Sequence, residues 1–269
     1  MNGNQNPLVV KLGGGSGLDI DAVCADLAEI ALVRPLVIVH GVSHMMAQLA
    51  DEHHVPQRML TSPTGHSFRY TDPETRNLYV QATGYVNHEI VSNLRSYGAP
   101  AVGLVDGVVI YGERKEAVRA VIDGRTRIIR DDYSGTISHV DVDSLRAILE
   151  NGQVPVLPPL ANSDDGFLNV DGDRASAAVA VALQADELVI LSNVRGLYRN
   201  FPDEASFVAE VNLRDIDHAM QWAKGRMKRK ALGAQEAITG GVSRVVIGDG
   251  RLNHPVTQAL QGIGTVFTC

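Results

Sequence analysis

Residues 11–17 hold the pattern with the clearest chemical meaning in the chain, a lysine followed by a run of glycines. Lys11 interrupts an apolar run at 8–12 that has the length and β-branched content of a buried strand, and a lysine is rarely buried without a negative partner. Glycines leave backbone N–H groups free to point at anionic oxygens. A helical pattern then starts at Asp19, and a helix N-terminus favours negative charge. The segment therefore indicates a phosphate site.

The glycine loop alone leaves two interpretations open. Its residue order fits neither common phosphate-binding motif, because the lysine precedes the glycines and the third glycine of GxGxxG is missing. A glycine-rich turn from a strand into a helix also serves as a plain tight bend. Charged residues elsewhere in the chain must decide between phosphate binding and a bend.

Acidic and amide side chains alternate where an extended segment enters an apolar helix, at Asn169, Asp171 and Asp173. One of these acids can simply cap the helix. An acid here can also hold a lysine ammonium in place and keep it charged. Arg69 lies beside a Gly/Pro turn just before another helix start, where it can fork onto a carboxylate or stay solvated at the surface.

Cationic residues crowd the start of the helix predicted over 226–239, at Lys228, Arg229 and Lys230. The helix dipole disfavours cations at this end, so a bound polyanion would offset the cost, whereas a solvated basic turn needs no ligand. Lys11 and Lys230 are then two lysines near helix N-termini, with an acid between them in sequence. Such a set can neutralise a phosphoryl group in transit, which is the main demand of phosphoryl transfer.

These residues must be positioned by alternating strands and helices, a pattern typical of a mostly parallel sheet covered on both faces. Asp106-Gly107 is a hairpin-turn signal between two short strands. The predicted strands are 8–12, 36–39, 100–105, 108–111, 115–121, 125–130, 154–157, 187–191, 245–247 and 265–267. The predicted helices are 19–33, 43–53, 72–97, 173–184, 213–221 and 226–239. A further helix, capped by Asp141 or Asp143, is predicted to reach Asn151. Residues 57–71 are expected to be irregular or hairpin-like.

Composition bounds the class of protein. The 269 residues suffice for one large α/β domain or two lobes that share a sheet. The net charge of −7 disfavours general nucleic-acid binding, and no apolar run reaches the roughly 20 residues of a membrane span. Two cysteines, Cys24 and Cys269, form no metal-type cluster, and the start of the chain shows no signal peptide, so we expect a cytoplasmic protein.

Five motifs occur in the order known from the amino-acid kinase family, and the resemblance covers nearly the whole chain. They are KLGGG at 11–15, SPTGHSFRYTD at 62–72, LNVDGDRASA at 168–177, LSNVRGLY at 191–198 and GRMKRKALGAQEA at 225–237. Within the family the chain resembles the acetylglutamate kinase branch. The segments TSPTGHSFRYTDPET, RIIRDDYSGTI, LSNVRGLY and GRMKRK make it most similar to kinases that phosphorylate α-aminoadipate attached to the acidic carrier protein LysW.

The resemblance implies an α/β fold, a three-layer αβα sandwich around a mostly parallel sheet. It implies an N-terminal acyl-substrate lobe at 1–161, which also dimerises, and a C-terminal nucleotide-binding lobe at 162–269. The implied activity is transfer of a phosphoryl group from ATP to a side-chain carboxylate, in lysine-type amino-acid biosynthesis. Mg²⁺ is expected to be held mainly by the ATP phosphates, without metal ligands from the protein.

Site residues carry over where this sequence matches the family's motifs. Lys11 and Lys230 match two transition-state lysines, and Asp173 matches the acid that organises them. The positions that match substrate-binding residues are Gly41, Val42, Arg69 and Asn169. The positions that match phosphate- and nucleotide-binding residues are Gly13, Gly14, Ser192, Asn193, Val194, Gly196, Leu197, Tyr198, Met227 and Lys228. The acceptor of the implied reaction is a side-chain carboxylate of the substrate, which has a reference pKa of about 4.3 and is already ionised at neutral pH. It therefore needs no general base, and we expect the nine histidines to lie at the surface or in packing.

Three departures from the family pattern lie in the substrate lobe. Val42 stands where a glycine is usual, residues 84–87 read GYVN in place of GKxN, and the serine-glycine pair expected after Gly103-Leu104 is absent. We therefore expect the ATP chemistry to be retained, a reshaped pocket beside Val42, and an altered acyl substrate.

Two alternatives to the carrier-linked reaction remain. One is an acetylglutamate kinase of arginine biosynthesis, and the other is a nucleotide- or amino-acid-binding regulator without catalysis, against which the retained lysines argue. An acidic carrier would need a basic rim around the acyl site, for which the candidates are Arg58, Arg69, Arg76 and Arg95. The resemblance also suggests a homodimer, and feedback inhibition by arginine is not expected.

Overall fold

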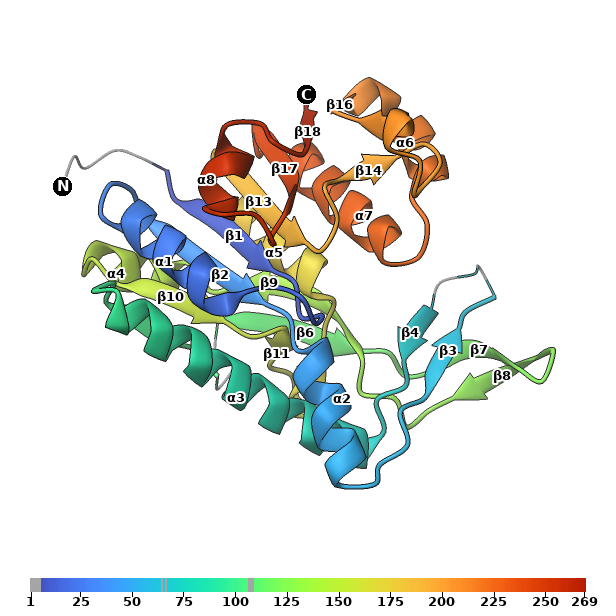
Figure 1. The fold of residues 1–269 in the computed structure, drawn as a ribbon. Coiled ribbons are helices and arrows are strands. Elements are labelled where there is room, and N and C mark those ends of the chain that lie inside the picture. The colour runs from blue at the N-terminus through green and yellow to red at the C-terminus, as the bar shows by residue number, and fades with distance from the viewer. Residues whose placement is uncertain (1–5, 64, 66, 106–108) are drawn as a thin grey trace.

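An eight-stranded sheet forms the centre of the computed structural model, which describes residues 6–63, 65, 67–105 and 109–269 (Figure 1). Its strand order is β16 (Glu210–Asn212), β18 (Thr265–Thr268), β17 (Arg244–Asp249), β13 (Glu187–Ser192), β1 (Leu8–Leu12), β2 (Leu36–His40), β10 (Val154–Leu157) and β5 (Ala101–Gly103). All neighbouring strands run parallel except β17 and β18. The predicted mostly parallel sheet is confirmed.

Helices cover both faces of this sheet, which confirms the predicted three-layer sandwich. Side chains alternate along β1, so that Val9 joins one apolar core and its neighbours Leu8 and Val10 join the other. The core that contains Val9 packs against α4 (Val142–Glu150), α5 (Gly172–Ala182), α6 (Ile216–Trp222) and α7 (Arg226–Thr239). The opposite core packs against α1 (Ile20–Ala31), α3 (Pro73–Ser96) and α8 (Pro255–Leu260).

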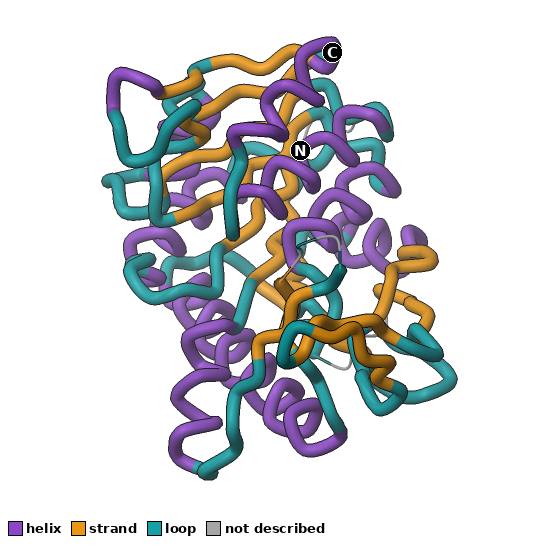
Figure 2. The backbone as a smooth tube through the Cα atoms, turned by 90° about the vertical axis from the view of Figure 1, so that its right-hand side faces the viewer, coloured by secondary structure: helices purple, strands orange, loops and turns teal. Residues whose placement is uncertain are grey.

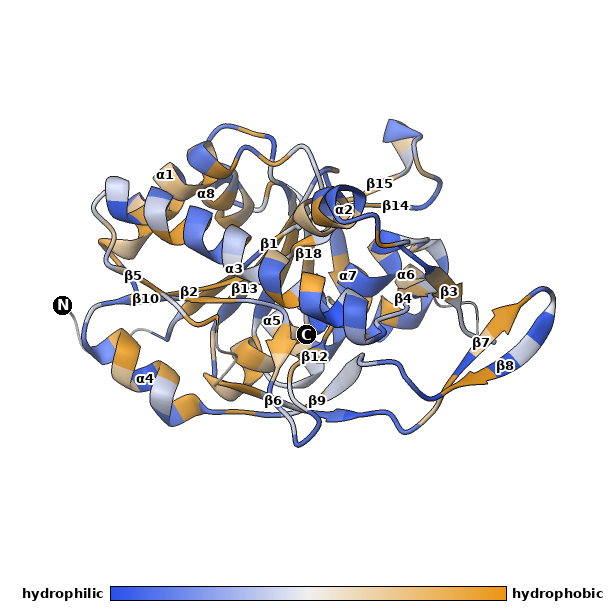
Figure 3. Cartoon of the chain, turned by 90° about the horizontal axis from the view of Figure 1, so that it is seen from below, coloured by the Kyte–Doolittle hydropathy of each residue, from blue (hydrophilic) through white to orange (hydrophobic). Residues whose placement is uncertain are grey.

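Burial on both faces explains why the central strands read as continuous apolar runs. All five residues of β1 and of β2 are buried. Seen from below, the central strands are mostly hydrophobic in colour, whereas polar residues are frequent on the helices (Figure 3). A third apolar cluster lies between α3 and α2 (Ser43–Glu52). Among the described helices, none has the length and apolar character that a membrane span requires.

A second, four-stranded sheet lies to one side of the central sheet (Figures 1 and 2). Its order is β4 (Ser67–Arg69), β3 (Met59–Thr61), β7 (Val118–Ile122) and β8 (Arg125–Ile129). The remaining pairs are β6 (Ile110–Arg114) with β9 (Gly135–Val140), β11 (Leu160–Ala161) with β12 (Leu168–Asn169), and β14 (Leu197–Tyr198) with β15 (Phe207–Val208). The hairpin-like form expected for residues 57–71 is therefore confirmed in β3 and β4, which pair antiparallel.

Aspartates start several helices, because a carboxylate satisfies backbone N–H groups that have no partner in the first turn. Asp19 accepts from the Ala22 N–H at 3.1 Å and starts α1. Asp72 accepts from the Thr75 N–H at 2.8 Å, so the cap lies at the predicted helix start. Of the two candidates for the cap of α4, the structure selects Asp141.

The predicted hairpin between strands 100–105 and 108–111 is wrong. β5 pairs parallel with β10 at one edge of the central sheet, and β6 pairs antiparallel with β9. The turn residues Asp106 and Gly107 themselves lie outside the described residues. Burial of Ala101 and Ile110, each 1% exposed, outweighs the local turn signal and directs each strand to a distant partner.

Candidate active site

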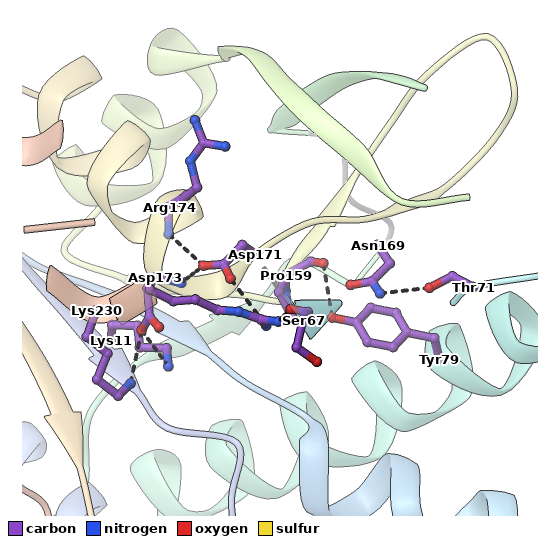
Figure 4. A network of polar contacts seen from close by, with 11 residues as sticks. Lys11, Ser67, Thr71, Tyr79, Pro159, Asn169, Asp171, Asp173, Arg174 and Lys230 are labelled. Carbon is purple, nitrogen blue, oxygen red and sulfur yellow. Dashed lines mark hydrogen bonds and ion pairs between the residues drawn. The ribbon is translucent and has the colours of Figure 1, made fainter. Parts of the chain in front are cut away.

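Three charged side chains meet in the interior beside the carboxyl end of β1. The Lys11 Nζ lies 2.9 Å from Oδ1 of Asp173, and the Lys230 Nζ lies 3.1 Å from the same oxygen (Figure 4). Each of the three side chains is less than a tenth exposed. Lys11 comes from the central strand β1, Asp173 from the first turn of α5 and Lys230 from α7. The structure thus brings Asp173 together with the two lysines that the sequence singled out.

One carboxylate between two ammonium groups leaves an excess positive charge. Burial opposes ionisation of Asp173, yet the two lysines hold its pKa well below its usual range. Burial alone would lower the pKa of Lys11, but the attraction of Asp173 raises it. Burial, followed by repulsion from Lys11, lowers the pKa of Lys230 to about 8 against the pull of Asp173. A buried site with unbalanced positive charge is suited to an anion.

Two glycine loops touch at the carboxyl ends of β1 and β2, next to this cluster. A Cβ added at Gly14 would lie 2.2 Å from the Val42 nitrogen, and one added at Gly41 would lie 2.6 Å from the Gly14 nitrogen. No side chain fits in either position, so glycine is required at both. The Gly14 carbonyl also accepts from the His44 N–H at 2.6 Å, which connects the first loop to α2. The predicted phosphate-binding glycines Gly13 and Gly14 thus lie on a rigid double loop.

Val42 is accommodated in the apolar packing of α2. Its side chain is 3% exposed and belongs to the cluster that contains Met46 and Leu49. The valine therefore adds a buried contact under the helix and leaves the tight approach of Gly14 to the Gly41–Val42 backbone intact. The reshaped pocket that the sequence suggested here is not required by the packing of Val42.

The residues predicted to hold the amino-acid end of a substrate lie on β4 and β12. Asn169 Nδ2 donates to Thr71 Oγ1 at 3.0 Å. Arg69 is half-buried in β4, and burial, together with repulsion from Arg229 and Arg226, lowers its pKa although Tyr79 opposes the shift. Three guanidinium groups close enough to repel one another also favour an anionic ligand.

Arg229 is a site residue that the sequence motifs did not assign. Its guanidinium donates to the Ser67 carbonyl of β4 and lies 3.6 Å from an oxygen of Asp171. Asp171 in turn accepts from the Asp173 N–H at 3.0 Å and caps α5. Arg229 therefore connects the helix that carries Lys230 to the hairpin that carries Arg69. Only its place in the basic run 228–230 marked it in the sequence.

The residues predicted to bind nucleotide lie in two segments, one that follows the end of β13 and one at the start of α7. Ser192 ends β13, where its carbonyl accepts from the Gly250 N–H at 2.7 Å, and Asn193 and Val194 lie in the following loop. Of the remaining residues, three are buried and two lie at the start of a helix. Gly196, Leu197 and Tyr198 are buried, and Met227 and Lys228 are in the first turn of α7.

Close packing fixes this turn. A Cβ at Gly196 would lie 2.4 Å from Thr265 Oγ1, and the same oxygen accepts from the Leu197 N–H at 2.8 Å. Tyr198 donates its hydroxyl to Glu204 at 2.9 Å. The side chain of Leu197 is therefore used in packing. Only the backbone and the neighbouring loop are left for the nucleotide contact that the sequence predicts here.

His40 lies close enough to the lysine cluster for the charge of Lys11 to act on it. It is fully buried at the end of β2, and its Nε2 lies 3.2 Å from Asn87 Nδ2. Burial, reinforced by the charge of Lys11, lowers its pKa to about 4, so the imidazole is neutral at physiological pH. The expected packing role fits His40, whereas His53 and His54 are exposed. Among the described residues, no group of three or more His, Cys, Asp or Glu side chains could hold a metal ion.

Comparison with known proteins assigns the chain to a family. The family model described as amino acid kinase matches residues 6–249, which include all three members of the charged cluster. The chain belongs to the amino acid kinase family. It is 44% identical over 268 residues to a LysW-aminoadipate kinase of Deinococcus radiodurans, covering 98% of this chain and 92% of that protein.

Two further relatives and one solved structure support this assignment. A LysW-aminoadipate kinase of Thermus thermophilus is 41% identical over 96% of this chain and 99% of its own. A putative LysW-aminoadipate/LysW-glutamate kinase of Pyrococcus furiosus is 39% identical over 89% of this chain and 95% of its own. N-acetylglutamate synthase of Neisseria gonorrhoeae shares the fold with a TM-score of 0.80 at 28% identity, and this amino acid kinase chain spans 59% of that protein's length.

Replacing either buried lysine should abolish most turnover. Lys11→Met and Lys230→Met keep an unbranched apolar chain but remove the charge opposite a transferring phosphoryl group, so we expect kcat to fall by about 100-fold or more. Lys224→Met, at an exposed lysine, is the matched control and should keep wild-type kcat. Steady-state kinetics on folded variants decides the matter, and wild-type kcat in either buried variant would refute the assignment.

The lowered pKa of Lys230 predicts a specific pH dependence. Because the ammonium is the binding form, kcat/KM should fall as the pH rises through about 8. The folded protein loses this proton at about pH 8, whereas the unfolded chain keeps it up to the ordinary lysine pKa of 10.5. Between these two values the unfolded state binds more protons, so the contribution of Lys230 to the free energy of unfolding rises with pH. A pH profile of kcat/KM recorded beside the melting temperature separates the two effects. A flat profile to about pH 9.5 would contradict the shift.

Proposed function

We propose that the protein transfers the γ-phosphoryl group of ATP to the side-chain carboxylate of α-aminoadipate, which is linked through its amino group to an acidic carrier protein of the LysW type. The product is an acyl phosphate in lysine-type biosynthesis. The observation that carries this proposal is the pair of buried ammonium groups on one oxygen of Asp173, beside two touching glycine loops.

The chemistry of a carboxylate acceptor matches this site. A carboxylate oxygen attacks the γ-phosphorus while the bond to the β-phosphate oxygen breaks and ADP leaves with that electron pair. The acceptor is already ionised at neutral pH, so the attack requires no general base, in accord with the neutral, buried His40. What the reaction does require is relief of repulsion between two anions, which Lys11 and Lys230 supply.

Each part of the site takes one role in this reaction. Lys11 and Lys230 stabilise the charge on the transferring phosphoryl group, and Asp173 holds the two ammonium groups at one point. The backbone N–H group of Gly14 donates to phosphoryl oxygens. Gly41, which the sequence also matched to a backbone donor, gives its N–H to the Leu12 carbonyl at 2.9 Å, so its role is to permit the close approach of the two loops. Arg69 and Asn169 bind the amino-acid end of the acyl substrate. ATP occupies the surface from Ser192 to Tyr198 and the turn at Met227–Lys228, with Mg²⁺ held by its phosphates.

The division into lobes follows from these roles. Residues 1–161 form the acyl-substrate lobe, which contains the hairpin β3–β4 and α3, and residues 162–269 form the nucleotide lobe, which contains β13 and α7. Arg229 spans the boundary between them through its contact with Ser67. A homodimer formed through the first lobe is part of this proposal.

A carrier-linked substrate is supported by the names of the relatives and by a basic hairpin. The strands β7 and β8 present the exposed arginines Arg119, Arg125 and Arg127 beside the hairpin β3–β4. On a chain of net charge −7, a local group of arginines suits an acidic protein partner. These residues replace part of the predicted rim, since Arg95 lies in the last turn of α3 and donates to the Ala101 carbonyl.

The other substrate candidates are glutamate on the same type of carrier and free acetylglutamate. The Pyrococcus furiosus relative carries both LysW-linked amino acids in its name, which favours the first of these as the second candidate. Both candidates share the reacting carboxylate, so the charged cluster serves all three substrates equally.

A panel of three acceptors tests the proposed function. We expect ATP turnover with carrier-bound aminoadipate to exceed that with carrier-bound glutamate and with free acetylglutamate in kcat/KM. The measurement is acyl-phosphate formation trapped with hydroxylamine, with Lys230→Met protein as the blank. Turnover of free acetylglutamate alone would overturn the carrier assignment while leaving the kinase chemistry standing.

The basic hairpin predicts a salt-dependent carrier interaction. Arg125→Glu with Arg127→Glu should raise KM for the carrier-bound substrate by about tenfold at low salt, since rim charges act mainly on association. The difference from wild type should shrink as salt screens the charges. The matched control is Arg146→Glu with Arg214→Glu, at two exposed arginines outside this hairpin. Equal effects of the two double variants would contradict a specific docking role for the hairpin.

A further inference from the structure

Asp132 is a buried carboxylate that the proposed reaction does not use. It is 1% exposed, and within the described part of the chain no lysine, arginine or histidine forms an ion pair with it. Its oxygens accept hydrogen bonds from the Thr71 N–H at 2.8 Å, from the Ser134 N–H at 3.3 Å and from the Ser134 hydroxyl. A buried carboxylate that is stabilised by hydrogen bonds alone fixes the positions of its donors.

The donors of Asp132 lead directly to the amino-acid end of the site. Both backbone polar groups of Thr71 are hydrogen-bonded, because its N–H donates to Asp132 and its carbonyl accepts from the Tyr133 N–H at 2.7 Å. The Thr71 hydroxyl accepts from Asn169 Nδ2 at 3.0 Å, and the Asn169 N–H donates to the Tyr133 carbonyl at 2.9 Å. Segments around residues 71, 132–134 and 169 therefore close into one hydrogen-bonded ring.

This ring sets which atom of Asn169 is available to a substrate. The Thr71 hydroxyl donates to the Arg69 carbonyl at 3.2 Å, so its oxygen accepts from Asn169 through the amide nitrogen. The side-chain oxygen of Asn169 is then the atom that can accept a hydrogen bond. An amino acid linked through its amino group offers an amide N–H, which is a matching donor.

Tyr133 prevents the segment around Asp132 from moving. The guanidinium groups of Arg76 and Arg114 each lie over its ring, 4.1 Å from the ring centre. Arg114 also donates to the Asp132 carbonyl at 2.9 Å, and both arginines bind Asp165. Two cation–π contacts and these hydrogen bonds together help to hold the segment in place.

We propose that Asp132 is a positioning residue for the acyl substrate, acting through Thr71 to orient Asn169 and the neighbouring Arg69. This inference rests on the proposed function and deepens it, because it names the buried group that prepares the site for an amide-linked amino acid. Asp132 touches no reacting atom, so its effect falls on acyl-substrate binding and not on ATP.

The variant Asp132→Asn tests this role. It keeps the size of the side chain but places an amide N–H₂ where one carboxylate oxygen accepted hydrogen bonds. We expect KM for carrier-bound aminoadipate to rise by about tenfold or more, with KM for ATP within about twofold of wild type. The matched control is Asp141→Asn, because Asp141 binds the Ser144 N–H at 3.1 Å and the Ser144 hydroxyl at 2.6 Å in the same way at the start of α4.

A second variant keeps the test decisive if Asp132→Asn fails to fold. Thr71→Val retains the backbone contact with Asp132 but removes the hydroxyl that orients Asn169, and it should raise the same KM. If Asp132 acts through Thr71, the two changes together should raise KM by less than the product of their separate effects.

The outcomes separate this inference from the proposed function. An active wild-type enzyme with unchanged acyl-substrate KM in a folded Asp132→Asn or Thr71→Val variant overturns the positioning role alone. Equal rises in KM for ATP and for the acyl substrate, or an equal effect of Asp141→Asn, also overturn it. Wild-type protein that turns over neither carrier-bound nor free acyl substrates overturns the proposed function, and the inference with it.

Discussion

The site depends on one electrostatic constraint, which is that two ammonium groups share a single carboxylate oxygen in the protein interior. Removing these charges from water is costly, and Asp173 can balance only one of them. The fold supports the arrangement by placing Lys11 on the central strand and the other two residues on helices that pack against each other. A bound anion would offset the remaining charge, so the imbalance that costs free energy in the free protein favours anion binding.

Uncharged backbone lies close beside the charged side chains. The loops after β1 and β2 approach so closely that Gly14 and Gly41 exclude side chains, and the one bulky neighbour, Val42, packs into the apolar core under α2. Backbone donors in such a setting cost little reorganisation when charge develops nearby. The residues that we propose for binding the acyl substrate form a different set, which lies on the hairpin β3–β4, on β12 and on the ring that contains Asp132.

Sequence reasoning succeeded where the signal is local or where chemistry restricts the choice. Apolar runs of four to six residues become the central strands, aspartates mark helix starts, and an interrupting lysine in a buried strand requires an acid such as Asp173. It failed where a distant partner decides the outcome. The turn signal at Asp106-Gly107 lost to the pairing of β5 with β10, and Asp132 acquires its meaning from Thr71, 61 residues earlier in the chain. A single sequence contains no record of such pairings.

The place of β1 in the sheet has a consequence for how the protein is made. Among the described strands β1 comes first along the chain, yet one of its two neighbours is β13, which begins at residue 187. Until that part of the chain is synthesised, one edge of a strand that is fully buried in the finished fold has no partner, and such edges pair readily with other chains. The edge of β1 that pairs with β13 therefore stays open, beside Lys11, until the second half of the chain closes the sheet. The cluster of Lys11, Asp173 and Lys230 can therefore assemble only after the second half of the chain has been made.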